Sequence, residues 1–474
     1  MAAAECVPFI KAGGLADVMG SLPKALVKLG HEVKVVLPKY DRIPAEYEAQ
    51  FTEGKALEVP FKEGMKLCKT YGLILEGAEY IFVENEALFS RGTIYGEPDD
   101  HTRFAFLSRA VLAVAEAQEE QVDILHAHDW HTAIIPFLLK EDNRYASLQA
   151  HLKIVLTIHN LQFQGNFPKE VFAEDFGMDG SFYEDGKVSW KGHFNHLKTG
   201  IIYADQVTTV SPSYRDEILT SQYGEGLEPL LQEKGEGLIG ILNGLDTEFY
   251  NPATDLVIEM EYDHTSLERK AVNKRAIQKK FGLAERGDIP LLAMVSRLTD
   301  QKGVDVLQDL LPELMQAEDL QFVLLGSGRA HHEEFFKELS IRFPEKVKVH
   351  IGFDEDLAHL LYAGADIFLM PSHFEPCGLS QLISMRYGTI PVANKTGGLK
   401  DTVIEYDPVL RSGNGFLSDF SNHQPFDEAL GRALSLYQQE GHWETIKQNC
   451  MQGDYSWTRS AGEYAEVYRK IAER

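Results

Sequence analysis

Two strand-to-helix turns in the second half of the chain carry residue types that suit a phosphorylated sugar. Glu375 lies in the turn at 371–380, directly after the apolar run 366–370. A second turn, Lys-Thr-Gly-Gly-Leu at 395–399, follows the apolar run 389–393. In open α/β sheets, ligands bind at the carboxyl ends of the strands, and glycines there let backbone N–H groups approach an anion. Because a carboxylate accepts hydrogen bonds from sugar hydroxyls, the two turns together predict a nucleotide-sugar site.

Arg297 and Lys302 offer the positive charge that a diphosphate needs. Both lie in the segment 296–303, which follows a strand of buried type at 290–296. Arginine presents a planar fork to phosphate oxygens, and lysine presents a compact point charge. Two solvated loop cations are the simpler alternative, but the position at the carboxyl end of a strand favours a binding role.

The turn at 395–399 has a counterpart near the start of the chain. Residues 11–15 read Lys-Ala-Gly-Gly-Leu, and each copy stands where a helix is expected to begin. One Gly-Gly turn is weak evidence, but two in matching positions of two α/β domains predict a ligand clamped in the cleft between them. The turn at 325–328 does not complete Gly-x-Gly-x-x-Gly, so a dinucleotide fingerprint is unsupported.

Histidines gather at two strand ends in the first half of the chain. The segment 126–131, His-Ala-His-Asp-Trp-His, superficially resembles a metal site, but no cysteine or carboxylate framework accompanies it at a familiar spacing. A polar pocket in which Trp130 stacks on a sugar ring is the better interpretation. His159 follows the run 153–158, and alone it would be explained as a satisfied histidine at a strand end.

Apolar runs alternate with helical stretches along the chain and form two series. The first series of expected strands is 32–37, 80–83, 122–126, 153–158, 206–210 and 238–242. The second series is 290–296, 321–325, 346–351, 366–370 and 390–393. Turn formers at 243–252 separate the series, and a terminal amphipathic helix is expected at 455–474. This alternation predicts two α/β domains with parallel sheets covered on both faces.

Composition narrows the class of protein further. The 474 residues fit two domains, and 72 acidic against 46 basic residues give a formal net charge of −26. A nucleic-acid or anionic-membrane surface is disfavoured, because phosphate backbones need basic patches. The four cysteines have no metal or disulfide spacing, and we see neither a membrane span nor a signal peptide. A cytoplasmic protein with reduced thiols is therefore expected.

Taken together, the motifs resemble those of the bacterial glycogen (starch) synthases. The elements that carry the resemblance run in family order over almost the whole chain: 11–18, 126–131, 157–161, 210–214, 243–246, 296–298, 301–303, 374–379 and 396–399. The co-occurrence of so many short motifs in one order is highly specific.

The resemblance implies the GT-B architecture, in which two Rossmann-like, doubly wound domains face a deep inter-domain cleft. The domains would span 1–245 and 246–455, and a C-terminal helix at 456–474 would cross back to the first domain. The implied activity is the retaining transfer of glucose from ADP-glucose to the non-reducing end of an α-1,4-glucan such as glycogen. No metal or other cofactor is implied, because arginine and lysine supply the charge, and neither nucleic acid nor a membrane is an implied partner.

The resemblance also implies roles for the matching positions. The residues implied to be catalytic are Lys11, His159, Arg297, Lys302 and Glu375. Those implied to bind the donor are Gly13, Gly14, Asn243, Phe353, Cys377, Gly378, Leu379, Thr396 and Gly397. Those implied on the acceptor side are Tyr95, Asp129, Trp130 and Asn160. Within these sets, Phe353 would stack on adenine, and Glu375 would bind the hydroxyls of the donor glucose.

Three features depart from the family pattern. His373 stands where arginine is expected, Ala12 replaces a common threonine, and only four residues precede Glu5, where the family usually has a longer first strand. Three alternatives stay open: a related enzyme with a UDP donor or a smaller acceptor, a phosphorylase, and a glucan-binding protein that has lost catalysis. Donor competition would identify the first and release of glucose 1-phosphate the second. The complete set of predicted catalytic side chains argues against the third.

Overall fold

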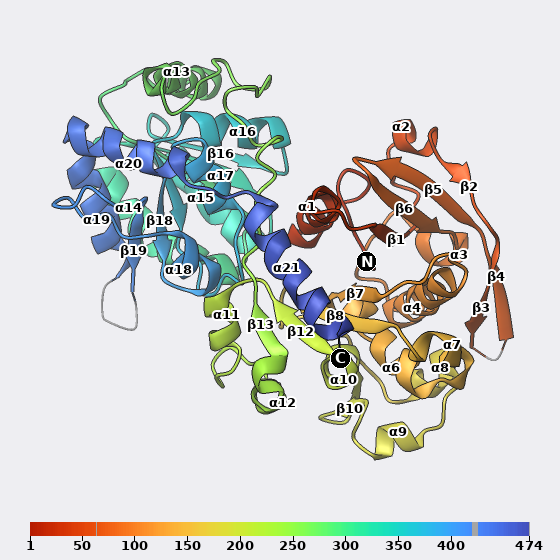
Figure 1. Cartoon of the computed structure of the whole chain (residues 1–474). Helices are drawn as coiled ribbons and strands as arrows, with labels where there is room; N and C mark the ends of the chain where they lie inside the picture. The colour runs from red at the N-terminus through yellow and green to blue at the C-terminus, as the bar shows by residue number, and fades with distance from the viewer. Residues whose placement is uncertain (63, 420–424, 474) are drawn as a thin grey trace. The chain divides into compact units, whose positions relative to one another are not determined.

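The computed structural model describes residues 1–62, 64–419 and 425–473, and the chain divides into two compact units (Figure 1). Unit 1 comprises Met1–Gly244 and Trp457–Arg474, and unit 2 comprises Leu245–Ser456. Each unit is a mixed α/β structure built on parallel strands, which confirms the expected fold class. None of the helices among the described residues is long and apolar enough to cross a bilayer.

The strands of unit 1 fall into two main groups, in the orders β1-β6-β5-β2 and β13-β12-β8-β7. The strands are β1 Lys34–Pro38, β2 Thr52–Glu53, β3 Leu57–Phe61, β4 Gly64–Cys68, β5 Thr70–Leu75, β6 Ala78–Val83, β7 Ile124–His128, β8 Lys153–Ile158, β9 Asn166–Phe167, β10 Ser189–Trp190, β11 His193–Asn195, β12 Gln206–Thr209 and β13 Leu238–Gly240. Ala2 bridges Val36 of β1 and Ala127 of β7, both in parallel. Its N–H donates to the carbonyl of His126 at 2.8 Å, so the first residues join the two groups into one sheet.

Part of unit 1 is antiparallel, which the sequence did not predict. β5 runs antiparallel to β6 and to β2, β3 pairs with β4 as a hairpin, and β9, β10 and β11 form a small antiparallel sheet. Most of these strands are short or solvated, since β2, β9 and β10 have two residues each, whereas the six-residue β5 is mostly shielded and was overlooked. Four of the five residues of β4 are exposed, so no apolar run marks this strand.

The helices of unit 1 include the end of the chain. They are α1 Gly14–Lys28, α2 Ala45–Glu48, α3 Glu86–Phe89, α4 Asp100–Glu116, α5 Asp129–Thr132, α6 Ile135–Glu141, α7 Ala146–Gln149, α8 Glu170–Phe176, α9 Ser181–Glu184, α10 His196–Tyr203, α11 Pro212–Glu217, α12 Glu228–Lys234 and α21 Trp457–Ala472. α21 packs against α1 and β8 (Figure 1). Its buried residues recur at helical spacing, from Trp457 through Tyr464 to Ile471, so one apolar stripe faces the unit.

Unit 2 is organised around a sheet in the order β16-β15-β14-β17-β18-β19, in which every pair is parallel. The strands are β14 Leu291–Val295, β15 Gln321–Gly326, β16 Val347–Ile351, β17 Ile367–Met370, β18 Ile390–Asn394 and β19 Phe416–Ser418. The helices are α13 Lys270–Phe281, α14 Val304–Ala317, α15 Ala330–Arg342, α16 Glu355–Gly364, α17 Ser380–Arg386, α18 Gly397–Thr402, α19 Phe426–Tyr437 and α20 Glu440–Gln452, and a 3₁₀ turn, η4, spans Asp300–Lys302. The central strands are buried along their length, as expected where helices cover both faces.

One pair of helical glycines tests the close packing of unit 2. A Cβ atom on Gly364, at the end of α16, would lie 2.4 Å from Cδ1 of Ile277 and 2.6 Å from the backbone oxygen of Asn273. We expect Gly364→Ala to lower the free energy of unfolding by about 1–3 kcal/mol, because the backbone of α13 must move. A Cβ on Gly431 in α19 meets nothing within 4 Å, so Gly431→Ala should raise stability by up to about 1 kcal/mol. Urea unfolding followed by circular dichroism measures both, and equal effects would contradict the packing argument.

Candidate active site

The two turns that the sequence singled out in unit 2 lie against each other. β17 and β18 are parallel neighbours, so the turns that follow them leave the sheet at the same edge. The N–H of Gly398 donates to the carbonyl of Glu375 at 3.0 Å, and the side chain of Asn394 donates to the carbonyl of Ser372 at 3.0 Å. A Cβ on Gly398 would lie 2.1 Å from the carbonyl oxygen of Cys377. This glycine therefore permits a backbone approach that no larger residue would allow.

Lys302 and Glu375 form a partly buried ion pair at this edge of the sheet. Their Nζ and Oε2 atoms are 2.6 Å apart, and the hydroxyl of Ser372 donates to the same oxygen at 3.0 Å. Glu375 is only 5% exposed. Gly303 brings the lysine into place, since it has φ +68° and a Cβ there would lie 1.9 Å from the carbonyl oxygen of Pro371. Two residues that are far apart in the sequence thus share one polar site.

Arg297 lies in the same loop as Lys302, between β14 and η4, and is exposed. Within the ranges that the structure describes, its guanidinium forms no ion pair. His373, which replaces the expected arginine, is turned toward Asp305 of α14, with its Nε2 at 2.8 Å from a carboxylate oxygen. The loop between β14 and η4 therefore supplies Arg297, which has no ion pair among the described residues, and leads into Lys302, which is paired with Glu375.

The other predicted donor residues of unit 2 occupy the same carboxyl edge. Cys377 and Thr396 are buried, Leu379 is half-buried, and Gly378 and Gly397 have positive φ values of 74° and 44°. These residues belong to the two packed turns. Phe353 follows β16 at this edge and is 79% exposed, which is unusual for a large apolar ring and suits a stacking partner.

The Lys-Ala-Gly-Gly turn of unit 1 is organised by Glu5, a residue to which the sequence analysis gave no role. The carboxylate of Glu5 accepts hydrogen bonds from the backbone N–H groups of Ala12 and, at 2.9 Å, Gly13. Burial raises the pKa of this carboxyl group. These two N–H groups are therefore not free for a phosphate, which changes the interpretation of the turn. Lys11 pairs with Asp17 at 2.7 Å and is exposed, and Gly14 begins α1.

The predicted acceptor-side residues sit around the carboxyl ends of β7 and β8. Asp129 has φ +57°, and its Oδ1 accepts a hydrogen bond from the N–H of His159 at 2.7 Å. Burial raises the pKa of Asp129 to about 7. Asn160 uses its side-chain oxygen to cap the N–H of Gln162 at 3.0 Å. Asn243, which was predicted on the donor side, lies at the end of unit 1 and is buried.

Trp130 and Tyr95 are packed into an aromatic cluster. Trp130 is 8% exposed, and its ring lies 4.2 Å from that of His131 and 5.2 Å from that of Phe104, measured between centroids. The ring of Tyr95 stacks on His131 at 4.7 Å. Trp130 is therefore a packed ring, and the structure does not present it as an open stacking platform.

The histidines of 126–131 are not arranged as metal ligands. Among the described residues, the group of side chains close enough to share a metal ion is Asp300, His331 and His332. Asp300 in that group already pairs with Arg329 and with His332.

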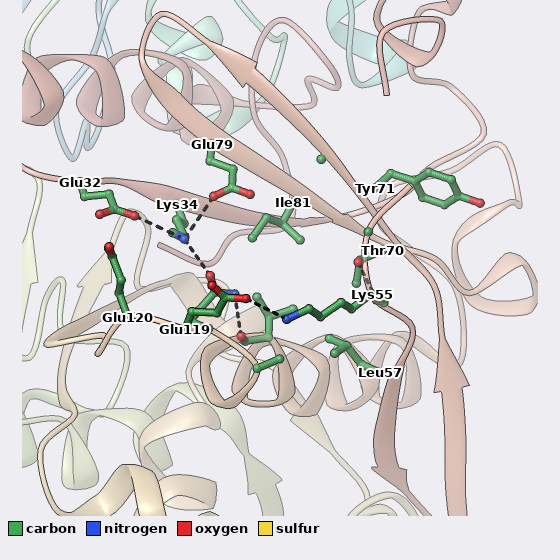
Figure 2. Close-up of a pocket in the computed structure, with 15 residues that line it drawn as sticks. Glu32, Lys34, Lys55, Leu57, Thr70, Tyr71, Glu79, Ile81, Glu119 and Glu120 are labelled. Atoms are coloured by element: carbon green, nitrogen blue, oxygen red, sulfur yellow. Dashed lines mark hydrogen bonds and ion pairs between the residues drawn. The ribbon is translucent and has the colours of Figure 1, made fainter. Parts of the chain in front are cut away.

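A cavity elsewhere in unit 1 includes none of the predicted site residues (Figure 2). It has a volume of about 440 Å³, and β1, β5, β6 and the end of α4 contribute to its walls. In its lining, Lys34 contacts Gln118 at 2.8 Å and Glu32 and Glu79 at 3.3 Å each (Figure 2). The lining carries four glutamates against two lysines, and we assign this hollow no ligand.

The raised pKa of Asp129 predicts a specific pH dependence of stability. The folded pKa of about 7 exceeds the ordinary value of 3.8, so the native state holds a proton that the unfolded state releases between these values. The stability from this proton is complete below pH 3.8 and is lost as the pH rises to 7. The difference in unfolding free energy between the wild type and Asp129→Asn should fall by up to about 1.4 kcal/mol per pH unit in this range.

Urea unfolding of both proteins between pH 4.5 and 8 measures this difference. Asparagine keeps the acceptor for the N–H of His159, so the variant should preserve the local structure. The contributions of the other titrating groups to the pH dependence are then the same in both proteins and cancel in the difference. A difference that does not change with pH would contradict a protonated Asp129.

Comparisons with known proteins agree with this arrangement of motifs. Residues 1–233 match a family model described as the starch synthase catalytic domain, and residues 275–449 match one described as glycosyl transferases group 1. The chain is 46% identical to a glycogen synthase from Geobacillus thermodenitrificans over 475 residues, covering 100% of this chain and 97% of that protein. It is also 46% identical to a glycogen synthase from Bacillus subtilis, covering 99% of this chain and 97% of the relative.

Solved structures extend the comparison to the fold. The catalytic domain of starch synthase IV from Arabidopsis thaliana, bound to ADP and acarbose, superposes with a TM-score of 0.92 at 35% identity, covering 100% of this chain and 99% of that one. Sucrose-phosphate synthase from Thermosynechococcus elongatus, with a TM-score of 0.59 at 18% identity over 97% of this chain and 94% of its own, shares the fold alone. The architecture is GT-B, and the chain belongs to the glycogen and starch synthase family of glycosyltransferases, which make glycogen by glucosyl transfer.

Proposed function

We propose that the chain transfers glucose from ADP-glucose to the non-reducing end of an α-1,4-glucan with retention of the anomeric configuration. The observation that carries the proposal is the partly buried pair of Lys302 and Glu375, with Arg297 exposed beside it in the same loop. A nucleotide sugar needs cations for its diphosphate and an acceptor for its hydroxyls, and this edge offers both. The Arabidopsis relative described as bound to ADP and acarbose adds support for the class of ligand.

On the donor side, Arg297 and Lys302 hold the diphosphate and stabilise the negative charge that develops on the departing ADP. Glu375 accepts hydrogen bonds from the hydroxyls of the glucose. Phe353 stacks on adenine. The two turns at 371–380 and 395–399 form the rest of the donor pocket. The residues that line it are Cys377, Gly378, Leu379, Thr396 and Gly397.

Unit 1 contributes the remaining groups. Lys11 leaves Asp17 to contact the donor phosphates, and the turn at Gly13 and Gly14 keeps this lysine in place. Asn243 lies near the donor, and His159 lies beside the anomeric carbon. Tyr95, Asp129, Trp130 and Asn160 shape the acceptor side, with Trp130 acting through packing.

The transfer itself is a same-face substitution. The 4-hydroxyl of the terminal glucose forms a bond to the anomeric carbon of the donor while the bond from that carbon to the ADP oxygen breaks. The departing phosphate takes the proton of the attacking hydroxyl, so charge and atoms balance without a further reagent. Because the arginine and the lysines supply the positive charge, we propose that no metal ion is needed, and turnover should persist in EDTA.

The decisive experiment is ADP release from ADP-glucose, with and without glycogen, beside the same assay with UDP-glucose. Release that depends on glycogen and prefers ADP-glucose is the expected result. A preference for UDP-glucose would overturn the donor assignment. Release of glucose 1-phosphate from glycogen and phosphate, without transfer from either nucleotide sugar, would indicate a phosphorylase instead.

Removing either partner of the ion pair should abolish most of the turnover. We expect Lys302→Ala to lower kcat by roughly 10²–10³-fold, the effect of deleting one group that stabilises transition-state charge. Glu375→Gln should also lower kcat strongly, because it replaces the charged acceptor of the glucose hydroxyls with a weaker neutral one. Lys337→Ala is the matched control, because Lys337 is exposed and its ion pair among the described residues is a long one, to Glu333 at 3.9 Å. Circular dichroism verifies that each variant is folded. Turnover near the wild-type value in both site variants would contradict the assignment.

A further inference from the structure

Two histidines from neighbouring strands of unit 1 share a hydrogen bond. Nδ1 of His128, at the end of β7, lies 3.0 Å from Nε2 of His159, which follows β8. His128 is fully buried, whereas His159 is partly exposed. The backbone N–H of His128 is held by the carbonyl of Ala2 at 3.2 Å and by the hydroxyl of Thr132 at 2.8 Å. His128 is thus a fixed support for a more accessible ring.

The hydrogen bond between these two rings can run in one of two directions. Burial lowers the pKa of His128 well below its ordinary value and that of His159 to about 3, so both rings are neutral. Between two neutral imidazoles, one nitrogen donates and the other accepts. Either Nδ1–H of His128 donates to His159, or Nε2–H of His159 donates to His128.

The other nitrogen of His128 distinguishes the two arrangements. Nε2 of His128 is buried and has no hydrogen-bond partner among the described residues. If His159 were the donor, this nitrogen would carry an N–H group that is buried without an acceptor. If His128 is the donor, the same nitrogen is a bare acceptor, and unpaired buried acceptors are tolerated better than unpaired N–H groups.

The neighbouring His126, on the same strand, does not share this constraint. Nδ1 of His126 lies 2.7 Å from the hydroxyl of Tyr468, and its Nε2 lies 2.6 Å from the hydroxyl of Thr157. Hydroxyl groups both donate and accept, so either tautomer of His126 is satisfied.

We propose that His128 is a positioning residue that donates its Nδ1–H to Nε2 of His159, and thereby fixes His159 as the tautomer with its proton on Nδ1. The proposal rests on the function proposed above, in which His159 lies beside the reacting sugar. Asp129 holds the backbone N–H of His159 at 2.7 Å, so backbone and ring are both anchored. The ring then presents an N–H donor, which suits an oxygen of the glucosyl unit, such as a hydroxyl or the ring oxygen.

Asparagine and leucine at position 128 form a matched pair, because their side chains have the same branched skeleton. The amide of His128→Asn can place an N–H near the position of Nδ1, and His128→Leu fills the same volume without a donor. We expect the asparagine variant to keep kcat within about threefold of the wild type. We expect the leucine variant to lose roughly 10- to 100-fold in kcat, as when a reacting group is misplaced, with KM for ADP-glucose changed much less.

The tautomer is read directly by ¹⁵N NMR of the full chain labelled at histidine, since protonated and bare ring nitrogens differ strongly in chemical shift. His159→Asn identifies the His159 signals, because they disappear in that variant. We expect Nδ1 of His159 to be protonated in the wild type and in His128→Asn, and the two tautomers to mix in His128→Leu. His126→Gln is the control for disturbing a buried histidine on the same strand, and it should leave the His159 tautomer unchanged.

Three results would overturn the proposal: a protonated Nε2 on His159 in the wild type, an unchanged tautomer and kcat in His128→Leu, or equal losses in the asparagine and leucine variants. The spectrum needs no turnover, so the pairing is tested even if the wild type fails to transfer glucose. In that case the proposed function fails, and with it the role of His128 in that function, while the tautomer assignment stands or falls on the spectrum.

Discussion

Parallel strand pairing is the constraint on which the candidate site of unit 2 depends. β14, β17 and β18 are neighbours in the sheet and run in the same direction, so the chain leaves all three at one edge. Every polar group assigned to the donor in this unit lies in the segments that follow these strands or β16. The backbones of these segments must then approach each other closely, at Gly303 against Pro371 and at Gly398 against Cys377. Glycine at these points is a packing requirement, and the approach of Lys302 to Glu375 follows from it.

The resulting ion pair is suited to exchange partners with a ligand. A buried carboxylate and ammonium lose hydration, and their mutual attraction offsets that loss only while they remain paired. Ser372 adds a hydrogen bond to the carboxylate, so Glu375 is satisfied before any ligand arrives. A nucleotide sugar brings hydroxyl donors for the glutamate and phosphate oxygens for the lysine. The site can therefore change from internal pairing to ligand pairing without leaving either charge alone.

In unit 1 the polar groups of the candidate site are buried mainly in their neutral forms, in contrast to the ion pair of unit 2. His126, His128 and His131 are buried in a cluster of rings, and burial lowers the pKa of each. Asp129, beside them, has its pKa raised by the same desolvation. The histidines of the cluster thus stay neutral while supplying directed hydrogen bonds. Glu5 is likewise buried, in the turn before α1, where its carboxyl group accepts hydrogen bonds from two backbone N–H groups.

The sequence by itself determined the fold class, the alternation of strands and helices, and the site segments of unit 2. It could do so because buried parallel strands are marked by continuous apolar runs, and the residues after each run must lie at the carboxyl edge of the sheet. The solvated strand β4 of unit 1 carries no such mark, since it is almost wholly exposed.

Only the tertiary structure decided which side chains meet. The ion pair of Lys302 with Glu375, the capture of the Gly13 N–H by Glu5, and the contact of His128 with His159 each join residues from separate elements. Pattern and spacing report which residues share an element, whereas a hydrogen bond requires atoms within about 3 Å, and that distance is set by how the elements pack. For the same reason Trp130, which composition and position favoured as a stacking platform, proved to be a packed ring.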